Sequence, residues 1–185
     1  MTQKITIGVS ACLLGQRVRY NGEIKNIPAI ARDMAELVEF VPVCPEVECG
    51  LDVPRPPIQL EDDTENPRLR VIESREDLTA CMHEWAARRC GELVRHPPDG
   101  WLFKARSPSC GLGDVPVFRD EETIGTGDGM FVREIKKNMP DMPLASEAFL
   151  DDETAWESFV EAAAARASSS GRSADTAALK KLRNL

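Results

Sequence analysis

The sequence has little of what a conventional metal site or a membrane anchor requires. It contains only two histidines in 185 residues. Neither His83 nor His96 has a second imidazole or another ligand at a metal-binding spacing, so we predict structural roles for both. No apolar run approaches the roughly 20 residues of a membrane span. Residues 1–4 lead into an apolar run without a secretory signal. We therefore expect a soluble, globular protein of the cytoplasm.

Positive charge is also scarce. The chain has 23 Lys and Arg residues against 31 Asp and Glu residues, which gives a formal net charge of -8. This balance disfavours long-range attraction to a polyphosphate, although a local basic patch could still contact a short stretch of nucleic acid. A small neutral substrate fits the charge more easily.

Cysteine is present, with six residues, but not in the closely spaced pairs that are typical of structural zinc sites. A reducing compartment keeps most thiols free, so the cysteines do not predict a disulfide framework. Three of them, Cys12, Cys44 and Cys110, each follow a short apolar run that reads as a buried strand. The carboxyl ends of parallel strands are where ligands bind, so these three thiols could converge. Convergent thiols indicate a metal, a disulfide or a nucleophile.

The order of the apolar runs predicts the fold class. A strand at residues 5–9, a helix from about residue 26 to residue 38 and a strand at residues 39–44 form a parallel strand–helix–strand unit. We predict one α/β domain over residues 1–167, with a mostly parallel, Rossmann-like sheet flanked by helices and the site at the carboxyl ends of its strands. Residues 168–185 are expected to form a flexible polar and basic tail.

Further elements follow from periodicity. We expect helices at residues 76–94, 130–139 and 151–167, because apolar residues recur there at helical spacing. Residues 68–72 and 143–146 are expected to be short strands, residues 59–66 an exposed acidic segment, and residues 125–129 a plain turn before the helix at 130. Cys81 and Cys90 fall within the first of these helices, where we expect both to be small buried residues.

Two loops carry candidate chemistry. Residues 45–57 contain Pro45, Pro54, Pro56 and Pro57, which predicts a rigid loop without regular secondary structure. That loop holds Glu46 close to a thiol, as a positioned catalytic site requires.

The other loop, residues 104–111, combines the cations Lys104 and Arg106 with the hydroxyls of Ser107 and Ser109 beside Cys110. Such cations can lower a thiol pKa. Arg19 and Tyr20, in a turn after Cys12, could line a pocket or be solvated turn residues. Spacing alone leaves three chemistries open: a zinc site, a cubane iron–sulfur cluster with three cysteine ligands, and a persulfide-forming nucleophile.

Five motifs carry a resemblance to a known family. They are S-A-C-L-L-G at residues 10–15, V-R-Y-N-G at 18–22, V-P-V-C-P-E-V-E at 41–48, P-R-P-P at 54–57 and K-A-R-S-P-S-C-G at 104–111. In this order they resemble the thiouracil desulfidase family, over about residues 4–165. Residues 76–95 and 127–146 look most like the amino-terminal domain of longer relatives that remove sulfur from thiouridine in tRNA. We expect this chain to lack their additional domain, so a small thiolated base or nucleoside is expected more than tRNA.

The resemblance implies a 4Fe-4S cluster held by Cys12, Cys44 and Cys110, with the fourth iron open to the sulfur of a thione. It implies a hydrolysis of C=S to C=O with release of sulfide and no net electron transfer. Cys49 is expected to be a loop residue and not a ligand. A metal-stabilised nucleobase-binding module without turnover and a persulfide sulfur relay are the alternatives. The remaining site residues implied are Glu46 as base, Ser107, Ser109 and Lys104 as its catalytic partners, and Arg19, Tyr20 and Arg55 as substrate-binding residues.

Overall fold

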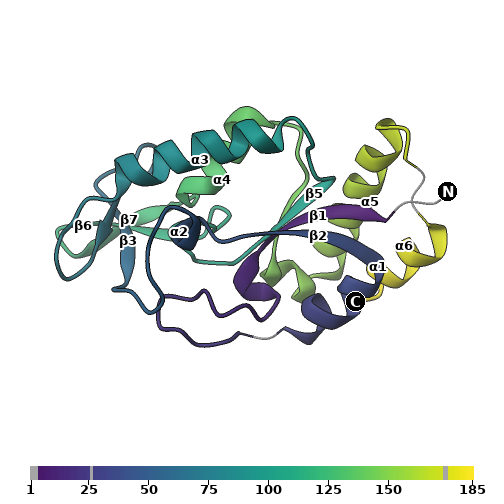
Figure 1. The fold of residues 1–185 in the computed structure, drawn as a ribbon, viewed down its shortest axis with the longest axis horizontal. Helices are drawn as coiled ribbons and strands as arrows, with labels where there is room; N and C mark the ends of the chain where they lie inside the picture. The colour runs from purple at the N-terminus through teal and green to yellow at the C-terminus, as the bar shows by residue number, and fades with distance from the viewer. Residues whose placement is uncertain (1–3, 26, 173–174) are drawn as a thin grey trace.

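The computed structural model describes residues 4–25, 27–172 and 175–185 of the chain. Within these residues the strands form two four-stranded sheets, which follow one another along the long axis in Figure 1. The first sheet is parallel throughout, in the order β2-β1-β5-β8. This sheet confirms the predicted α/β fold. Its strands are β1 (Ile5–Ser10), β2 (Val38–Val43), β5 (Gly100–Phe103) and β8 (Leu144–Ser146).

Helices cover both faces of the parallel sheet. Alternate residues of each strand point to opposite faces, so the strands contribute side chains to the packing on both sides. On β5, Leu102 packs into the cluster that includes α5 (Glu153–Ser169). Trp101 packs into the opposite cluster, with α3 (Thr79–Leu93) and α4 (Met130–Asn138). The Trp101 indole lies directly over β1 at Gly8, where a Cβ atom would be 2.4 Å from the ring. Only glycine therefore fits beneath this tryptophan.

The crossover from β1 to β2 runs through a short 3-10 turn, η1 (Ala11–Leu13), then a π-helical stretch, η2 (Ala29–Met34), and one turn of α-helix, α1 (Ala35–Leu37). Ile30 and Met34 are buried against the sheet. The predicted crossover helix is confirmed, although Val38 already belongs to β2. Residue 26, where we expected the helix to begin, lies outside the described residues.

The second sheet was not predicted as a unit. It has the order β4-β3-β6-β7, and of its strands only β4 was expected. The expectation of an exposed acidic segment at residues 59–66 is wrong at its start, because Leu60 and Glu61 are buried in β3. The expected turn at residues 125–129 is wrong in its first half, because β7 pairs with β6 up to Gly127. The strands are β3 (Ile58–Glu61), β4 (Arg68–Val71), β6 (Val115–Arg119) and β7 (Glu122–Gly127).

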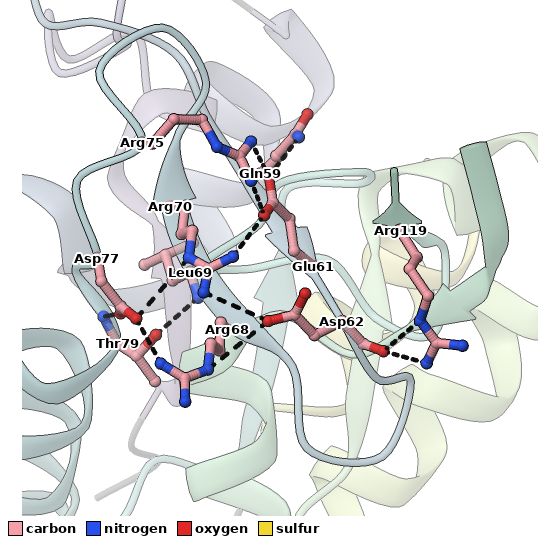
Figure 2. A network of polar contacts seen from close by, with 10 residues as sticks. All are labelled: Gln59, Glu61, Asp62, Arg68, Leu69, Arg70, Arg75, Asp77, Thr79 and Arg119. Carbon is pink, nitrogen blue, oxygen red and sulfur yellow. Dashed lines mark hydrogen bonds and ion pairs between the residues drawn. The ribbon is translucent and has the colours of Figure 1, made fainter. Parts of the chain in front are cut away.

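A network of ion pairs makes the burial of Glu61 possible (Figure 2). Its carboxylate lies 2.9 Å from Arg70 and 2.6 Å from Arg75, and Gln59 donates a further hydrogen bond of 2.7 Å. Burial raises the pKa of Glu61, but the hydrogen bonds from Arg75, Gln59 and Arg70 outweigh it and hold the pKa below its usual value. The network fixes β3 against β4.

The carboxy-terminal segment differs from the expectation. We expected residues 168–185 to be a flexible tail, but residues 176–183 form α6 (Thr176–Arg183), which packs on α5. Leu182 is buried, and its carbonyl accepts a hydrogen bond of 2.6 Å from Trp156 Nε1. The helix forms because Asp175 caps its first turn and one apolar edge reaches the core. None of the described helices is both long and apolar enough to cross a membrane.

The other helices match the predicted bounds, but one of their cysteine side chains is not buried as we expected. α3, α4 and α5 lie within about three residues of their expected bounds. Cys90 is buried in α3, as expected. Cys81 is exposed on the same helix, so the expectation that it is buried is wrong.

Candidate functional site

A cavity of about 460 Å³ lies where the carboxyl ends of the parallel strands face the second sheet. Cys12, Cys44 and Cys110 all line it, although they are far apart in the sequence. Cys12 sits in η1 directly after β1, Cys44 directly follows β2, and Cys110 lies in the loop after β5. The topology of three parallel strands therefore brings the three thiols to one place.

The Cys44 loop has a helical turn that we did not predict. Pro45 opens α2 (Pro45–Glu48), with Cys44 at its N-cap. Prolines favour the first turn of a helix, where their missing N–H is not needed, so the expectation of a loop without regular structure is wrong at this point. The helical turn directs Glu46 into the cavity.

The Cys110 loop is fixed by the start of α4. Met130 N donates to Pro108 O at 3.0 Å and Phe131 N donates to Ser109 O at 2.9 Å. A Cβ atom on Gly129 would lie 2.6 Å from the backbone of Ser109, so glycine is required for this close approach. The first amides of α4 thus hold the cysteine loop and are not left open to an anion.

The three thiols share one buried environment. Burial is the main cause that raises the pKa of Cys12 to about 11, and the neighbouring Cys44 thiol raises it further, while the Lys104 ammonium opposes the rise. Burial also raises the pKa of Cys44, and raises that of Cys110 well above its usual value, with Cys12 and Cys44 adding to it. Thiolates crowded in this way are stabilised by a bound metal centre, which replaces their protons.

Three cysteine thiols at one cavity are a donor set that fits an iron–sulfur cluster. Within the described ranges no three His, Cys, Asp or Glu side chains lie close enough to ligate one metal ion. A tetrahedral zinc ion needs its ligands within about 2.3 Å of one point. In a cubane cluster each cysteine binds a different iron, so the cysteine ligands need not meet at one point. Cys12, Cys44 and Cys110 are the residues that could hold it.

Glu46 is held from two sides. Its Oε1 accepts a hydrogen bond of 2.9 Å from the Ser109 hydroxyl, and its Oε2 lies 2.6 Å from Arg55 Nη2. Ser109 is completely buried behind the cavity wall, so its hydroxyl orients Glu46. The Ser107 residue does line the cavity, and its hydroxyl accepts hydrogen bonds from the backbone N–H groups of Ser109 and Cys110.

The Lys104 ammonium stands on the Cys12 side of the cavity. It pairs with Glu147 Oε1 at 2.7 Å and donates to the Ala105 carbonyl at 2.7 Å. Glu147 is one residue that sequence reasoning missed, although its place directly after β8 is also a strand end. A second is Ser10. Its hydroxyl accepts a hydrogen bond of 3.0 Å from Lys104 N, and its hydrogen bonding to the Cys110 thiol opposes the rise in the pKa of that thiol.

The remaining predicted residues have different surroundings. Arg19 and Tyr20 line the mouth of the cavity, where Tyr20 is 44% exposed and Arg19 pairs with Glu23 at 3.2 Å. Arg55 also lines it, but its guanidinium is almost fully buried against protein atoms. His83 and His96 are both exposed and away from the cavity.

Cys49 does not line the cavity that the three thiols share. Its Sγ donates to the Glu46 carbonyl at 3.3 Å, and the Cys81 thiol donates to the Cys49 carbonyl at 3.5 Å. Burial raises the pKa of Cys49 to about 12, with Cys81 as the second cause. Cys49 is therefore a neighbour of α3 and not a wall of the cavity.

The second sheet closes the cavity with an apolar wall opposite the thiols. β3 contributes Ile58 and Leu60, and β6 contributes Pro116 and Phe118. A mostly apolar cleft with a few polar groups at one end is typical of a site for a small planar ligand. Sequence reasoning missed this wall because it missed the sheet.

Comparison with known proteins agrees with this geometry. A family model described as 2-thiouracil desulfurase matches residues 7–147. The chain belongs to the 2-thiouracil desulfurase family. Among solved structures, it is similar to a "[4Fe-4S]-dependent thiouracil desulfidase TudS", with 33% sequence identity and a TM-score of 0.63 over 81% of this chain and 94% of that one. No curated protein matches the chain.

The family predicted from the five motifs and the fold class predicted from the order of the apolar runs are thus confirmed. Membership in the 2-thiouracil desulfurase family makes the chain an enzyme of the desulfidase class. The non-catalytic binding module and the persulfide relay are not favoured.

Proposed function

We propose that this family member hydrolyses the C=S bond of a thiolated pyrimidine to C=O and releases sulfide, using a 4Fe-4S cluster held by Cys12, Cys44 and Cys110. The observation that carries the proposal is the convergence of these three thiols on one cavity that also holds a carboxylate, Glu46. Water replaces sulfide at the same carbon, so the reaction needs no electron donor.

Three cysteine ligands leave one iron of a cubane cluster without a protein ligand. When bound, the cluster would supply a soft Lewis acid that polarises the thione and makes sulfide a better leaving group. This part of the proposal is supported by Cys49, whose thiol donates to the Glu46 carbonyl and does not line the cavity, so that Cys12, Cys44 and Cys110 are the cysteines there.

Glu46 is the residue that activates water. A carboxylate has about four acceptor positions, and the described contacts of Glu46 leave room on Oε1 beside the Ser109 bond. Oε1 can therefore accept a proton from water while Arg55 and Ser109 keep the carboxylate in place. The proton then becomes available to the departing sulfur or to a ring nitrogen.

Lys104 and Ser107 are the other polar residues that we assign to the reaction. The Lys104 ammonium favours negative charge near Cys12. The Ser107 hydroxyl accepts two backbone N–H bonds and retains its own proton as a donor toward the cavity. Arg19 and Tyr20 at the mouth are the residues placed to contact the outer edge of the substrate.

The substrate we favour is a small thiolated base or nucleoside. A cavity of about 460 Å³ is within the range that encloses small ligands. The net charge of -8 gives no general attraction to a polynucleotide. A thiouracil ring would lie between the thiols and the apolar wall of β3 and β6.

The test is a substrate panel with anaerobically reconstituted protein. 2-Thiouracil, 4-thiouracil, the corresponding nucleosides and thiolated tRNA are offered separately, and sulfide and the oxo product are quantified by chromatography. We expect sulfide from the free bases or nucleosides. Sulfide from thiolated tRNA alone would refute the small-substrate part of the proposal, and no product from any substrate would refute the function.

A further inference from the structure

The Arg55 guanidinium makes four polar contacts with the protein, which use most of its five N–H donors. Its Nε and Nη2 lie 2.7 and 2.6 Å from Glu46 Oε2. Nη2 also donates to Val18 O at 2.9 Å, and Nη1 donates to Asp52 O at 3.1 Å. All three guanidinium nitrogens thus have partners within the described chain.

The backbone of the same residue ties down the loop above the cavity. Arg55 N donates to Tyr20 O at 2.7 Å. The residue therefore joins two separate segments, the turn at residues 18–20 and the helical turn that carries Glu46. Both segments line the cavity, and the turn includes the mouth residue Tyr20.

The ion pair between Arg55 and Glu46 is largely buried, so each side chain depends on the other. The side chains are 6% and 12% exposed, respectively. A buried carboxylate that loses its cation is left uncompensated and turns toward solvent or another donor. Two guanidinium nitrogens hold the single oxygen Oε2, a two-point contact that the one ammonium nitrogen of lysine cannot reproduce.

We propose that Arg55 is a positioning residue for the desulfidase reaction: it fixes Glu46 Oε2 so that Oε1 stays directed at the water to be activated. This inference rests on the proposed function, because it assumes that Glu46 is the base. It replaces the expectation that Arg55 contacts the substrate.

Substrate binding by Arg55 and positioning of Glu46 by Arg55 predict different kinetic effects. A residue that binds substrate raises KM when it is changed, whereas a residue that acts through the base lowers kcat. With Arg55→Gln we expect kcat to fall by about 10- to 100-fold, up to the usual contribution of a general base, with KM within about threefold. Arg55→Lys keeps the positive charge but loses the second nitrogen that contacts Oε2. Its kcat should therefore lie between that of wild type and that of Arg55→Gln.

The decisive measurement is the double variant Arg55→Gln with Glu46→Gln. If Arg55 acts only through Glu46, the double variant has the kcat of Glu46→Gln alone, within about twofold, because changes to directly coupled residues are not additive. Independent, multiplying losses would overturn the inference, as would a raised KM with an unchanged kcat.

Controls keep the result interpretable. Arg183→Gln removes an arginine that pairs with Glu161 at 3.4 Å, where neither residue lines the cavity, and kcat and KM should stay within about twofold of wild type. Iron content is measured for every variant, and Arg55→Lys carries the same comparison if Arg55→Gln does not fold. A wild-type protein that releases no sulfide would refute the proposed function, whereas an active wild type with additive losses refutes only the role of Arg55.

Discussion

Gly129 offers the sharpest structural test of how the Cys110 loop is held. Its φ is -63°, which any residue adopts, so the requirement for glycine is one of space alone. A Cβ atom would lie 2.6 Å from Ser109 C, 2.7 Å from Cys110 N and 2.8 Å from Gly111 N. All three are backbone atoms at or next to Cys110, the proposed ligand. Unlike side-chain atoms, they cannot rotate away from the added methyl group.

The size of the effect follows from those distances. Carbon atoms in contact sit about 3.5–4.0 Å apart, so Gly129→Ala must move the start of α4 and the Cys110 loop apart by about 1 Å. Such overpacking costs about 1–3 kcal/mol, and for a chain of this length each kcal/mol lowers Tm by about 2–4 °C. The displacement falls on the Cys110 thiol, so we expect less iron per chain after anaerobic reconstitution.

Gly91→Ala is the matched control. Gly91 lies in α3 with nothing within 4 Å of its would-be Cβ atom, so the same added methyl group should stabilise the helix by up to about 1 kcal/mol. Thermal unfolding and iron analysis of both variants complete the experiment. Wild-type Tm and full iron content in Gly129→Ala would refute the steric reasoning.

Three further predictions concern other residues. Glu46→Gln should lower kcat by about 10²-fold with unchanged iron content, and near-normal turnover would move the base elsewhere. Cys49→Ala should keep iron and activity while Cys110→Ala loses both, and equal iron loss in the two would make Cys49 a ligand. Asp77, whose pKa is lowered to about 2 by hydrogen bonds from the Thr79 side chain and backbone, adds stability above pH 4 that disappears as pH falls toward 2. Chemical unfolding at several pH values should show wild type and Asp77→Asn converging over that interval, and a constant difference would contradict it.

The parts of the site that the sequence predicted are those that depend on local signals. Cys12, Cys44 and Cys110 each follow an apolar run, and parallel strands end at one edge of their sheet, so their convergence follows from the order of strands and cysteines along the chain. Glu46 is within two residues of Cys44, so its nearness to a thiol was predicted, although the helical turn that begins at Pro45 was not. In these cases position in the chain nearly determines position in space.

The parts that were missed depend on contacts between distant segments. β3 ends on a carboxylate, Glu61, which reads as exposed until Arg70 and Arg75 are seen to pair with it. Leu182 lies in a polar segment and shows its role only through the hydrogen bond from Trp156. The steric role of Gly129 likewise comes from its approach to Ser109. Pattern-based prediction has no access to such pairings, because tertiary contacts override local propensity.

The central claim is that water replaces sulfide at a pyrimidine carbon, on a cluster held by Cys12, Cys44 and Cys110, with no electrons consumed. The most direct test incubates anaerobically reconstituted protein with 2-thiouracil in ¹⁸O-labelled water, without an electron donor, and measures sulfide and uracil together. We predict multiple turnovers, equal amounts of sulfide and uracil, and ¹⁸O in the uracil carbonyl. Turnover that depends on an added reductant, or uracil without the label, would contradict the account.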